Sequence, residues 1–427
     1  MSTSEGKLRL PLEGVRILDL GMFWAGPFAG KLLADAGAEV IKVESCSHPD
    51  NLRILARGLY PNGEKGEHPW NRSGMINERN RNKLGVTLEL GSEKGRDIFR
   101  RLVEISDVVI ENFSTRVLAR WELDYENLRV LNPRIILCSI YSQGAEGPES
   151  GFVSFGGTLE QLSGLAYITG YPDELPGLPN IQLPDPLGGT MAAGLVIAAL
   201  RQRRLTGEGC HIDFSQRENA VSVIGDVLLD YPMNNRVPER NGNFDEAMAP
   251  HGCYRCIGED DWITLGIRGD EEWVRLCLAI GQPDLAHDER FATITNRQSG
   301  KATLDSIISE WTATLSKHEA MARLQAANIA AGAVYTAKDL HEDPHLVARE
   351  FWEKVQDVEG GEHLYPSRPF RLSKTPLSTR TPAPTLGQHN RYVLQDLLHM
   401  TDNEIGGLIA QGVIGDEPTE DAQKGRL

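Results

Sequence analysis

The N-terminal segment carries the pattern that most restricts the fold of this chain. Residues 15–20 read as a short strand, 21–27 as a glycine-rich turn, 28–35 as a helix and 39–43 as a second strand. A strand, turn, helix and strand in this order predict a βαβ unit. Such a crossover joins two parallel strands of one sheet. The segment therefore predicts a fold of the α/β class.

Later segments repeat the alternation of strands and helices. Apolar runs at 108–110 and 135–139 follow helical segments such as 93–103, which extends the predicted parallel sheet. Ser215 and Glu218 have the spacing of a capping box, so a helix is expected to begin directly after Ser215. The elements expected in this part are a helix over 189–203, a strand over 211–214 and a helix over 216–229.

The length of the chain predicts more than one domain, because 427 residues exceed what one hydrophobic core usually fills. Residues 232–250 are rich in Asn, Gly and Pro and interrupt the α/β pattern. Beyond them we predict a strand over 262–266 and helices over 270–279, 304–312 and 317–326. The predicted organisation is a large α/β domain over 1–230, a smaller α+β domain over 231–332 and a return segment over 333–427 that completes the large domain.

Charge and cysteine usage narrow the classes of partner. The net charge of -16 disfavours nucleic acid and anionic membranes, since both are bound by clustered cations. The longest apolar run, 191–200, is too short to span a bilayer, and residues 1–10 lack a signal-peptide core. Six cysteines are scattered rather than clustered, so we expect reduced thiols and a cytoplasmic protein.

Several common enzyme motifs are missing from the sequence. Gly21, Gly26 and Gly30 do not form the dinucleotide G-x-G-x-x-G, and no Walker, G-x-S-x-G or H-E-x-x-H motif is present. Cys253 and Cys256 form a C-x-x-C without the second ligand pair that zinc requires. NAD, ATP and metal chemistry are therefore disfavoured, and the two cysteines are expected to be structural.

Basic residues gather in one stretch of an otherwise acidic chain. They are Arg53, Arg57, Arg72, Arg79, Arg81 and Lys83. One interpretation is a solvated surface. The other is a phosphate pocket, because guanidinium and ammonium groups form charge-assisted hydrogen bonds to phosphate oxygens.

Asp185 stands between two prolines in the segment 183–189, directly before an apolar helical stretch. Asp at a helix N-cap followed by Pro is a common way to begin a helix. The same position would also hold an ionised carboxylate near the positive end of a helix, where it can act as a nucleophile. The residues alone leave both interpretations open.

Taken together, these segments resemble the class III CoA-transferase family, which includes formyl-CoA and carnitine CoA-transferases. The resemblance runs almost from end to end and keeps the family's order of segments. The matching segments are 13–20, 25–27, 37–44, 81–83, 86–90, 111–113, 132–134, 183–189 and 387–390. The resemblance implies that coenzyme A is a co-substrate and that no cofactor is bound permanently.

The resemblance also assigns roles to residues. It makes Asp185 the nucleophile that forms an aspartyl-CoA thioester, and it places a substrate loop at Gly242 and Asn243. Ser45 and Tyr141 stand where formyl-CoA transferase has basic residues, so Arg53 or Arg72 are candidates to replace those contacts. The implied CoA contacts are Trp24, Ala25, Asn80, Lys83, Asn112, Phe113, Ser114, Arg120 and Tyr141.

Substrates, partners and two alternatives follow from the same resemblance. It implies an interlocked dimer, either of two identical chains or with a related subunit, and succinyl-CoA as the expected donor to a carboxylic acid. A racemase of the same superfamily needs a second acid/base, a histidine about thirty residues before the aspartate, where this chain has Phe155. The other alternative is a non-catalytic CoA-binding subunit.

Overall fold

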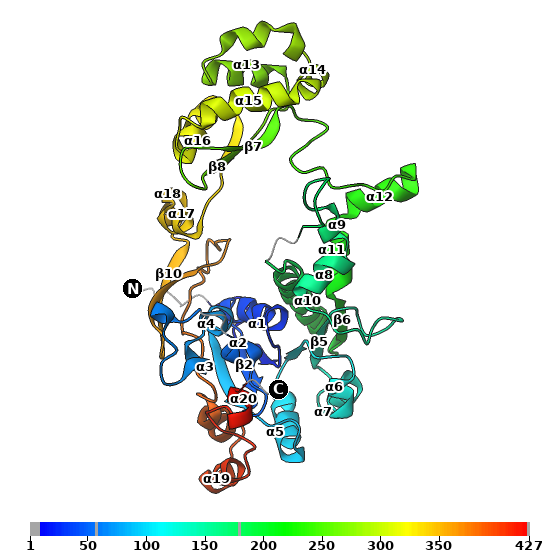
Figure 1. Ribbon diagram of the computed structural model, residues 1–427. Coiled ribbons are helices and arrows are strands. Elements are labelled where there is room, and N and C mark those ends of the chain that lie inside the picture. Colours follow the sequence, from blue (N-terminus) through cyan, green and yellow to red (C-terminus); the bar gives the residue numbers. More distant parts are fainter. Residues whose placement is uncertain (1–8, 56–58, 178–180, 425–427) are drawn as a thin grey trace, which may run out of the picture. The chain divides into compact units, whose positions relative to one another are not determined.

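The computed structural model describes residues 9–55, 59–177 and 181–424 (Figure 1). The chain divides into two units. The first comprises Met1–Leu165, Leu178–Leu229 and Arg349–Leu427, and the second comprises Ala166–Gly177 and Asp230–Ala348. Compared with the boundaries expected from the sequence, the second unit also takes in residues 166–177 and 333–348.

A six-stranded parallel sheet forms the centre of the first unit. Its strands are β1 (Arg16–Asp19), β2 (Glu39–Glu44), β3 (Lys83–Thr87), β4 (Val108–Glu111), β5 (Ile136–Tyr141) and β6 (His211–Ser215), in the order β3-β2-β1-β4-β5-β6. The predicted parallel sheet is therefore present. Because the strand order reverses between β1 and β4, the carboxyl ends of these strands flank a topological switch point, where ligands of such sheets bind.

Apolar side chains alternate between the two faces of this sheet, and each face has its own core. Ile17 and Val40 point toward α1 (Ala25–Asp35) and α10 (Pro184–Thr206). Leu18 and Ile41 pack with α5 (Glu93–Glu104) and with residues near the C-terminus, including the π-helical turn η4 (Tyr392–Leu397). Burial on both faces explains why apolar residues stand next to one another in these strands, as in Ile17–Leu18 and Val40–Ile41, rather than alternating with polar ones.

Two predicted helices differ from those observed. Helix α10 begins at Pro184 rather than at residue 189 because Pro is tolerated in a first helical turn. Its Gly189 lies so close to α1 that an added Cβ would be 2.6 Å from the Ala25 carbonyl oxygen. The helix expected over 216–229 is divided into α11 (Gln216–Val223) and α12 (Gly225–Asn234), although Ser215 caps its start as predicted.

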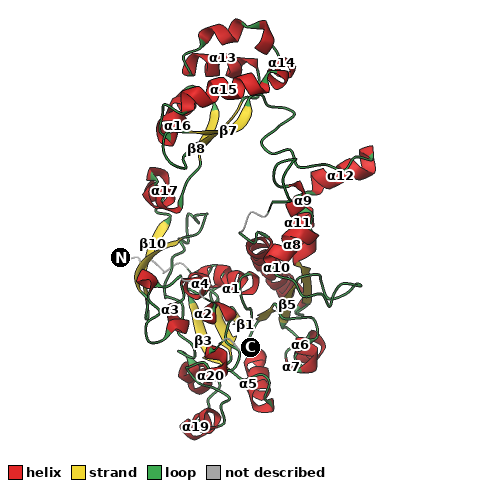
Figure 2. Cartoon of the chain, viewed as in Figure 1, coloured by secondary structure: helices red, strands yellow, loops and turns green. Residues whose placement is uncertain are grey.

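The second unit has a three-stranded antiparallel sheet, β7 (His251–Arg255), β8 (Trp262–Gly266) and β9 (Ala330–Ala333), in that order. Helices α13 (Asp270–Ala279), α15 (Lys301–Thr312) and α16 (Lys317–Ala326) share its apolar core (Figure 2). The strand predicted over 262–266 and the helices over 270–279 and 317–326 have the observed bounds. All six cysteines carry free thiols.

The remaining elements are short and connect these layers. They are α2 (Asn51–Ile54), η1 (Pro61–Gly63), α3 (Pro69–Arg72), α4 (Gly74–Arg79), α6 (Val117–Arg120), α7 (Tyr125–Leu131), α8 (Gly156–Leu162), α9 (Leu165–Ile168), η2 (Pro283–His287), η3 (Glu289–Phe291), α14 (Ile294–Ser299), α17 (Ala337–Glu342), α18 (Pro344–Ala348), β10 (Trp352–Asp357), β11 (Gly361–Pro366), α19 (Asp402–Ala410) and α20 (Glu420–Gln423). The helical pair expected over 388–411 is seen as η4 and α19.

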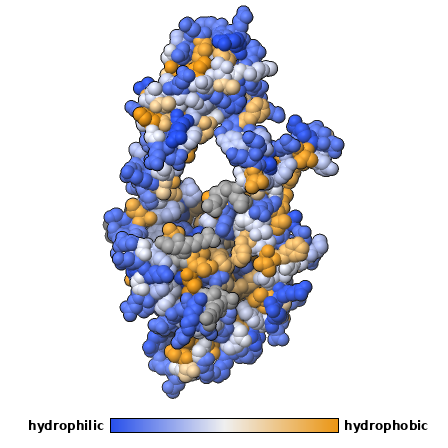
Figure 3. Space-filling model, in the orientation of Figure 1, coloured by the Kyte–Doolittle hydropathy of each residue, from blue (hydrophilic) through white to orange (hydrophobic). Residues whose placement is uncertain are grey.

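The face of the molecule drawn in Figure 3 is mainly hydrophilic. On this face, hydrophobic residues form separate patches among hydrophilic ones. Among the helices of the described residues, none has both the length and the apolarity needed to cross a bilayer.

Candidate active site

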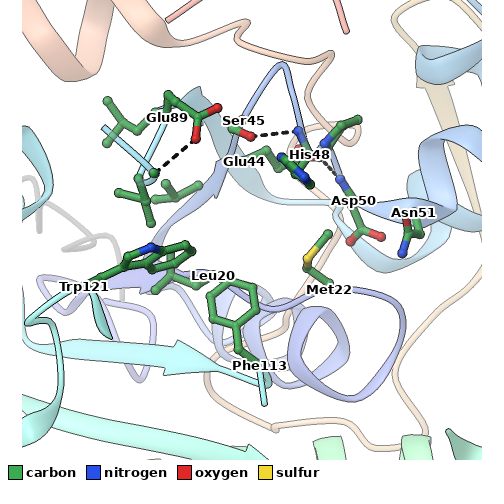
Figure 4. Close-up of a pocket in the computed structure, with 15 residues that line it drawn as sticks. Leu20, Met22, Glu44, Ser45, His48, Asp50, Asn51, Glu89, Phe113 and Trp121 are labelled. Atoms are coloured by element: carbon green, nitrogen blue, oxygen red, sulfur yellow. Dashed lines mark hydrogen bonds between the residues drawn. The ribbon is translucent and has the colours of Figure 1, made fainter. Parts of the chain in front are cut away.

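A cavity of about 420 Å³ opens at the carboxyl edge of the parallel sheet (Figure 4). Leu20, Phe113 and Trp121 form an apolar wall, and the rings of Phe113 and Trp121 meet edge to face with centroids 5.8 Å apart. Ser45 and Glu89 lie on the polar side. The lining residues follow β1, β2, β3 and β4, so the cavity lies at the switch point of the sheet.

Lys83 is the first residue of β3, and it is buried rather than among the residues that line the cavity. Its ammonium group donates to Asp19 Oδ2 at 2.6 Å, to the Pro27 carbonyl at 2.7 Å and to Asn80 Oδ1 at 2.8 Å, and its side chain is 0% exposed. Burial lowers the pKa of Lys83 to about 8, whereas Asp19 raises it. All three N–H donors are used within the chain in this structure, and the contact between Lys83 and a phosphate stays a prediction.

Arg53 is also unavailable as a substitute for the basic contacts absent at Ser45 and Tyr141. Its guanidinium forms a bidentate pair with Glu44, with Nη2 to Oε2 at 2.8 Å, and a further bond reaches the Pro384 carbonyl at 3.2 Å. Burial would raise the pKa of Glu44, but Arg53 lowers it to about 2. The pair ties the edge of the sheet to the C-terminal part of the chain.

The remaining members of the basic cluster have different surroundings. Arg72 donates to the carbonyls of Glu64 and Glu359. Arg81 is buried over the ring of Tyr365, 4.6 Å from its centroid. Arg57 lies outside the described residues. The predicted phosphate pocket is thus for the most part a set of internal contacts, because these side chains are held by carboxylates, carbonyls and a ring.

Arg79 is the member of the cluster that faces the candidate nucleophile. It ends α4, its guanidinium lies 4.2 Å from the centre of the Trp24 ring, and Nη1 donates to the Met75 carbonyl at 2.9 Å. Burial lowers the pKa of Arg79, while Glu78, Asp50 and Asp185 oppose that shift. Arg79 therefore places a cation near Asp185.

Asp185 lies in the first turn of α10, and Leu183 occupies the N-cap position. The cap interpretation of Asp185 is therefore wrong: its backbone N–H donates to the Gln182 carbonyl at 3.0 Å, and its side chain is free of a capping role. The carboxylate rests against Gly156 of α8, where an added Cβ would be 2.8 Å from Oδ2. Gly156 leaves the space that this carboxylate occupies.

The electrostatic surroundings make Asp185 unusually basic. Burial raises its pKa to about 7, Arg79 lowers the pKa, and Glu160 raises it. Within the described residues no hydrogen bond stabilises the ionised form. A carboxylate of this kind is a stronger nucleophile than one on an exposed surface.

The loop after β1 connects the cavity to Asp185. Met22 lines the cavity, and its backbone N–H and carbonyl pair with the Asn112 side chain at 2.7 and 2.9 Å. Phe23 adopts a positive φ of 61°, and its ring meets that of Phe155, the N-cap residue of α8, at 5.4 Å. Trp24 follows with Arg79 over its ring. The segment from Met22 to Trp24 therefore contacts both the cavity and the residues around Asp185.

The other predicted CoA contacts differ in exposure. Ala25 is buried at the start of α1, and the Asn80 amide is used within the chain, where it donates to the Ile76 carbonyl at 2.9 Å. Ser114 and Arg120 are exposed beside the cavity residue Trp121, and Arg120 Nε donates to the Arg116 carbonyl at 3.2 Å. Arg120 is therefore better placed than Lys83 to meet a ligand.

Tyr141 is buried at the end of β5, next to a buried carboxyl group. This is Glu111, which ends β4. Burial raises the pKa of Glu111 to about 7, although Ser139, the Phe113 backbone N–H and Tyr141 lower it. Glu111 Oε2 accepts from the Phe113 N–H at 2.7 Å and so fixes the start of the loop that lines the cavity.

Gly242 and Asn243 belong to the second unit. Gly242 has a positive φ of 55° and donates its N–H to the Gly170 carbonyl at 3.0 Å. The Asn243 amide donates to the Tyr171 hydroxyl at 2.9 Å. These bonds attach the predicted substrate loop to the segment 166–177 of the same unit.

Sequence reasoning missed three residues around Asp185: Arg79 as its cationic neighbour, Gly156 and Glu160. Gly156 and Gly157 form a doublet that could have indicated a close approach at the start of α8. No local pattern could have connected Glu160 with Asp185, because their relation depends on how α8 and α10 pack.

Known proteins are similar to this chain over nearly its whole length. The model of CoA-transferase family III matches residues 12–390. The succinyl-CoA–D-citramalate CoA-transferase of Chloroflexus aurantiacus is 37% identical over 95% of this chain and 98% of its own length. The succinate–glutarate CoA-transferase of Agrobacterium fabrum is 33% identical over 91% of this chain and 96% of its own.

A solved structure is similar to this chain as well. The CAIB/BAIF family protein from Brucella suis superposes with a TM-score of 0.83 at 30% identity, covering 91% of this chain and all of that one. A family model spanning most of the chain, relatives of matching length and a shared fold lead to one conclusion. The chain belongs to CoA-transferase family III and is a transferase that uses CoA thioesters.

Proposed function

We propose that this enzyme moves CoA from an acyl-CoA donor to a carboxylic acid through a covalent thioester on Asp185. The observation that carries the proposal is the Asp185 carboxylate itself. It is partly buried against Gly156, its pKa is raised by burial to about 7, and no hydrogen bond holds it within the described residues. A carboxylate held in this way is available to attack a thioester.

The proposed reaction needs no proton transfer. An Asp185 oxygen attacks the donor's thioester carbonyl, the C–S bond breaks, and a mixed anhydride and CoA thiolate result. The thiolate then attacks Cγ of Asp185, which releases the donor acid and leaves an aspartyl-CoA thioester. The acceptor carboxylate attacks the same Cγ and expels the thiolate, which attacks the acceptor's carbonyl and regenerates the Asp185 carboxylate. The thioester is exchanged, never hydrolysed.

The cavity at the switch point is the proposed binding site for the nucleotide end of CoA. Phe113 and Trp121 offer aromatic surface for an adenine ring. The exposed Arg120 next to Trp121 is the proposed phosphate partner. From there the thiol arm would follow Met22 and Trp24 toward Asp185.

The names of the relatives guide the choice of substrates. Succinyl-CoA is named as donor for the transferase that acts on D-citramalate, and succinate is paired with glutarate in the second. Both names describe small acids with two carboxylates. We therefore propose succinyl-CoA as donor and a small dicarboxylic acid as acceptor.

The test is an exchange assay with the purified chain alone. Succinyl-CoA and a panel of acids with one or two carboxylates are incubated with enzyme, and new CoA esters are measured by liquid chromatography and mass spectrometry. Transfer to dicarboxylic acids supports the proposal. Activity that appears only after a related subunit is added would instead favour the non-catalytic subunit.

The same preparation tests the racemase alternative and the assembly. The ring of Phe155 packs on Phe23 and cannot move a proton, so deuterium from heavy water should not enter the α-carbon of a 2-methylacyl-CoA. Rapid wash-in would contradict the transferase mechanism. The interlocked dimer stays a prediction, which light scattering during size-exclusion chromatography can check.

A further inference from the structure

Glu160 is a buried carboxylate that the proposed reaction does not use. It lies on α8, one helical turn after Gly156, and is 1% exposed. Residues four apart share one face of a helix. Gly156 contacts the Asp185 carboxylate, and Glu160 Oε1 accepts the backbone N–H of Leu183 at 2.9 Å. One face of α8 therefore meets the start of α10 at two points.

The hydrogen bond from the Leu183 N–H to Glu160 lies at the start of α10. Leu183 is the N-cap residue of α10, and its side chain cannot cap the helix, so the first turn depends on other contacts. A carboxylate that accepts a backbone N–H forms a charge-assisted hydrogen bond, which is stronger than one between neutral groups. Glu160 is thus tied to the residue two positions before the nucleophile.

We infer that Glu160 is a positioning residue for Asp185: it fixes the turn that carries the nucleophile and sets a second carboxylate beside it. This inference rests on the proposed role of Asp185. Glu160 would not touch the substrate. It would act through the placement of Asp185 and through the charge that Asp185 experiences.

The proposed effect of Glu160 on the charge of Asp185 depends on which charged side chains surround Asp185. Burial has the largest effect on the pKa of Asp185 and raises it. Among the described residues, two charged side chains also act on this pKa: Arg79 on α4 lowers it and Glu160 on α8 raises it. Lys31 and Asp35 on α1, and Arg217 and Glu218 on α11, lie on helices packed against α10 without such an effect. Glu160 therefore keeps Asp185 basic against the pull of Arg79.

Two conservative variants separate the two roles. Glu160→Gln keeps an oxygen acceptor for the Leu183 N–H but removes the charge. The pH midpoint of kcat/KM should then shift to lower pH, because the negative charge of Glu160 is one of the influences that raise the pKa of Asp185. Glu160→Asp keeps the charge but withdraws the acceptor by one methylene. It should preserve the midpoint and lower kcat by about tenfold, with little change in KM.

The matched control is Glu218→Gln, the same change on α11 at an exposed position, which should alter neither quantity. The inference is overturned if both Glu160 variants match this control in midpoint and kcat. It is also overturned if Glu160→Gln fails to fold while Glu160→Asp behaves as wild type, since the residue would then matter only to the core. Loss of activity in Asp185→Asn is measured separately, so a failure of the proposed nucleophile is distinguishable.

Discussion

Two acidic regions of the first unit differ in what surrounds their carboxylates. At the carboxyl edge of β1 and β2, Asp19 is paired with Lys83 at 2.6 Å and Glu44 with Arg53 at 2.8 Å, all of them buried. At the start of α10, Asp185 meets a glycine and has a cation nearby but no bonded partner in the described residues. A carboxylate bonded on all sides stabilises the fold, and an unbonded one is free to react.

The largest effect is expected at the unbonded carboxylate. Asp185→Asn replaces the nucleophile with an amide of the same shape and should lower kcat for CoA transfer by about 10³-fold or more. The fold should persist. Because the folded pKa of Asp185 is raised above its unfolded value, ionisation costs stability as pH rises toward 7, and the amide removes that cost. The melting temperature at pH 8 should therefore equal or exceed that of wild type. An Asp185→Asn variant with near wild-type kcat would show that the unbonded carboxylate is not the reactive one.

At the bonded carboxylates the expected effect is on stability. Lys83→Met leaves Asp19 buried without its cation and should lower the free energy of unfolding by about 3–5 kcal/mol. The control is Lys83→Met combined with Asp19→Asn, which removes both charges and should recover much of the loss. Urea unfolding followed by circular dichroism measures both. A single variant as stable as wild type would show that the pair is not structural.

The pair of Glu44 and Arg53 should be visible in acid. The folded pKa of Glu44 is lowered to about 2, so its contribution is present above the unfolded value of 4.5 and is lost as pH falls through 2. The shift corresponds to roughly 3 kcal/mol. Glu44→Gln with Arg53→Met should flatten the dependence of unfolding free energy on pH over this range. An unchanged slope between pH 4.5 and 2 would place the acid sensitivity elsewhere.

A smaller effect is expected in the cavity, which shares the edge with the bonded pairs. Phe113→Ala should raise KM for succinyl-CoA roughly tenfold and leave kcat nearly unchanged, because base stacking on an aromatic ring contributes about 1–3 kcal/mol. Leu131→Ala, a partly exposed apolar change on α7, serves as the control. A fall in kcat at constant KM would move the effect from nucleotide binding to the reacting groups.

Much of the fold could be predicted because its signals are local. The segments that form β1, β2, β4 and β5 are short, rich in aliphatic residues and separated by helical segments, so the local pattern is sufficient to locate them. The start of α10 was missed because Pro184 and Pro186 suggest a break before the helix, whereas proline is tolerated within a first helical turn. Division of the helix after Ser215 was missed as well, because its cap marks a start but not an end.

The site was only partly predictable for a related reason. Asp185 stands in a recognisable segment, but the state of the basic cluster depends on partners far away in sequence. Lys83 meets Asp19, 64 residues earlier, and Arg53 meets the Pro384 carbonyl, 331 residues later. No spacing within the cluster reveals such partners. An arginine that binds a phosphate and an arginine that pairs with a buried carboxylate therefore cannot be distinguished from the sequence alone.

The most direct test of the central claim is to trap the covalent intermediate. Wild-type enzyme is incubated with succinyl-CoA in the absence of acceptor and then treated with hydroxylamine, which converts an aspartyl thioester into a hydroxamate. Peptide mass spectrometry should find the hydroxamate on the peptide that contains residues 183–189, at Asp185, and should find none there in Asp185→Asn. A hydroxamate on Glu111, Glu160 or another carboxylate of the wild-type enzyme would contradict the account.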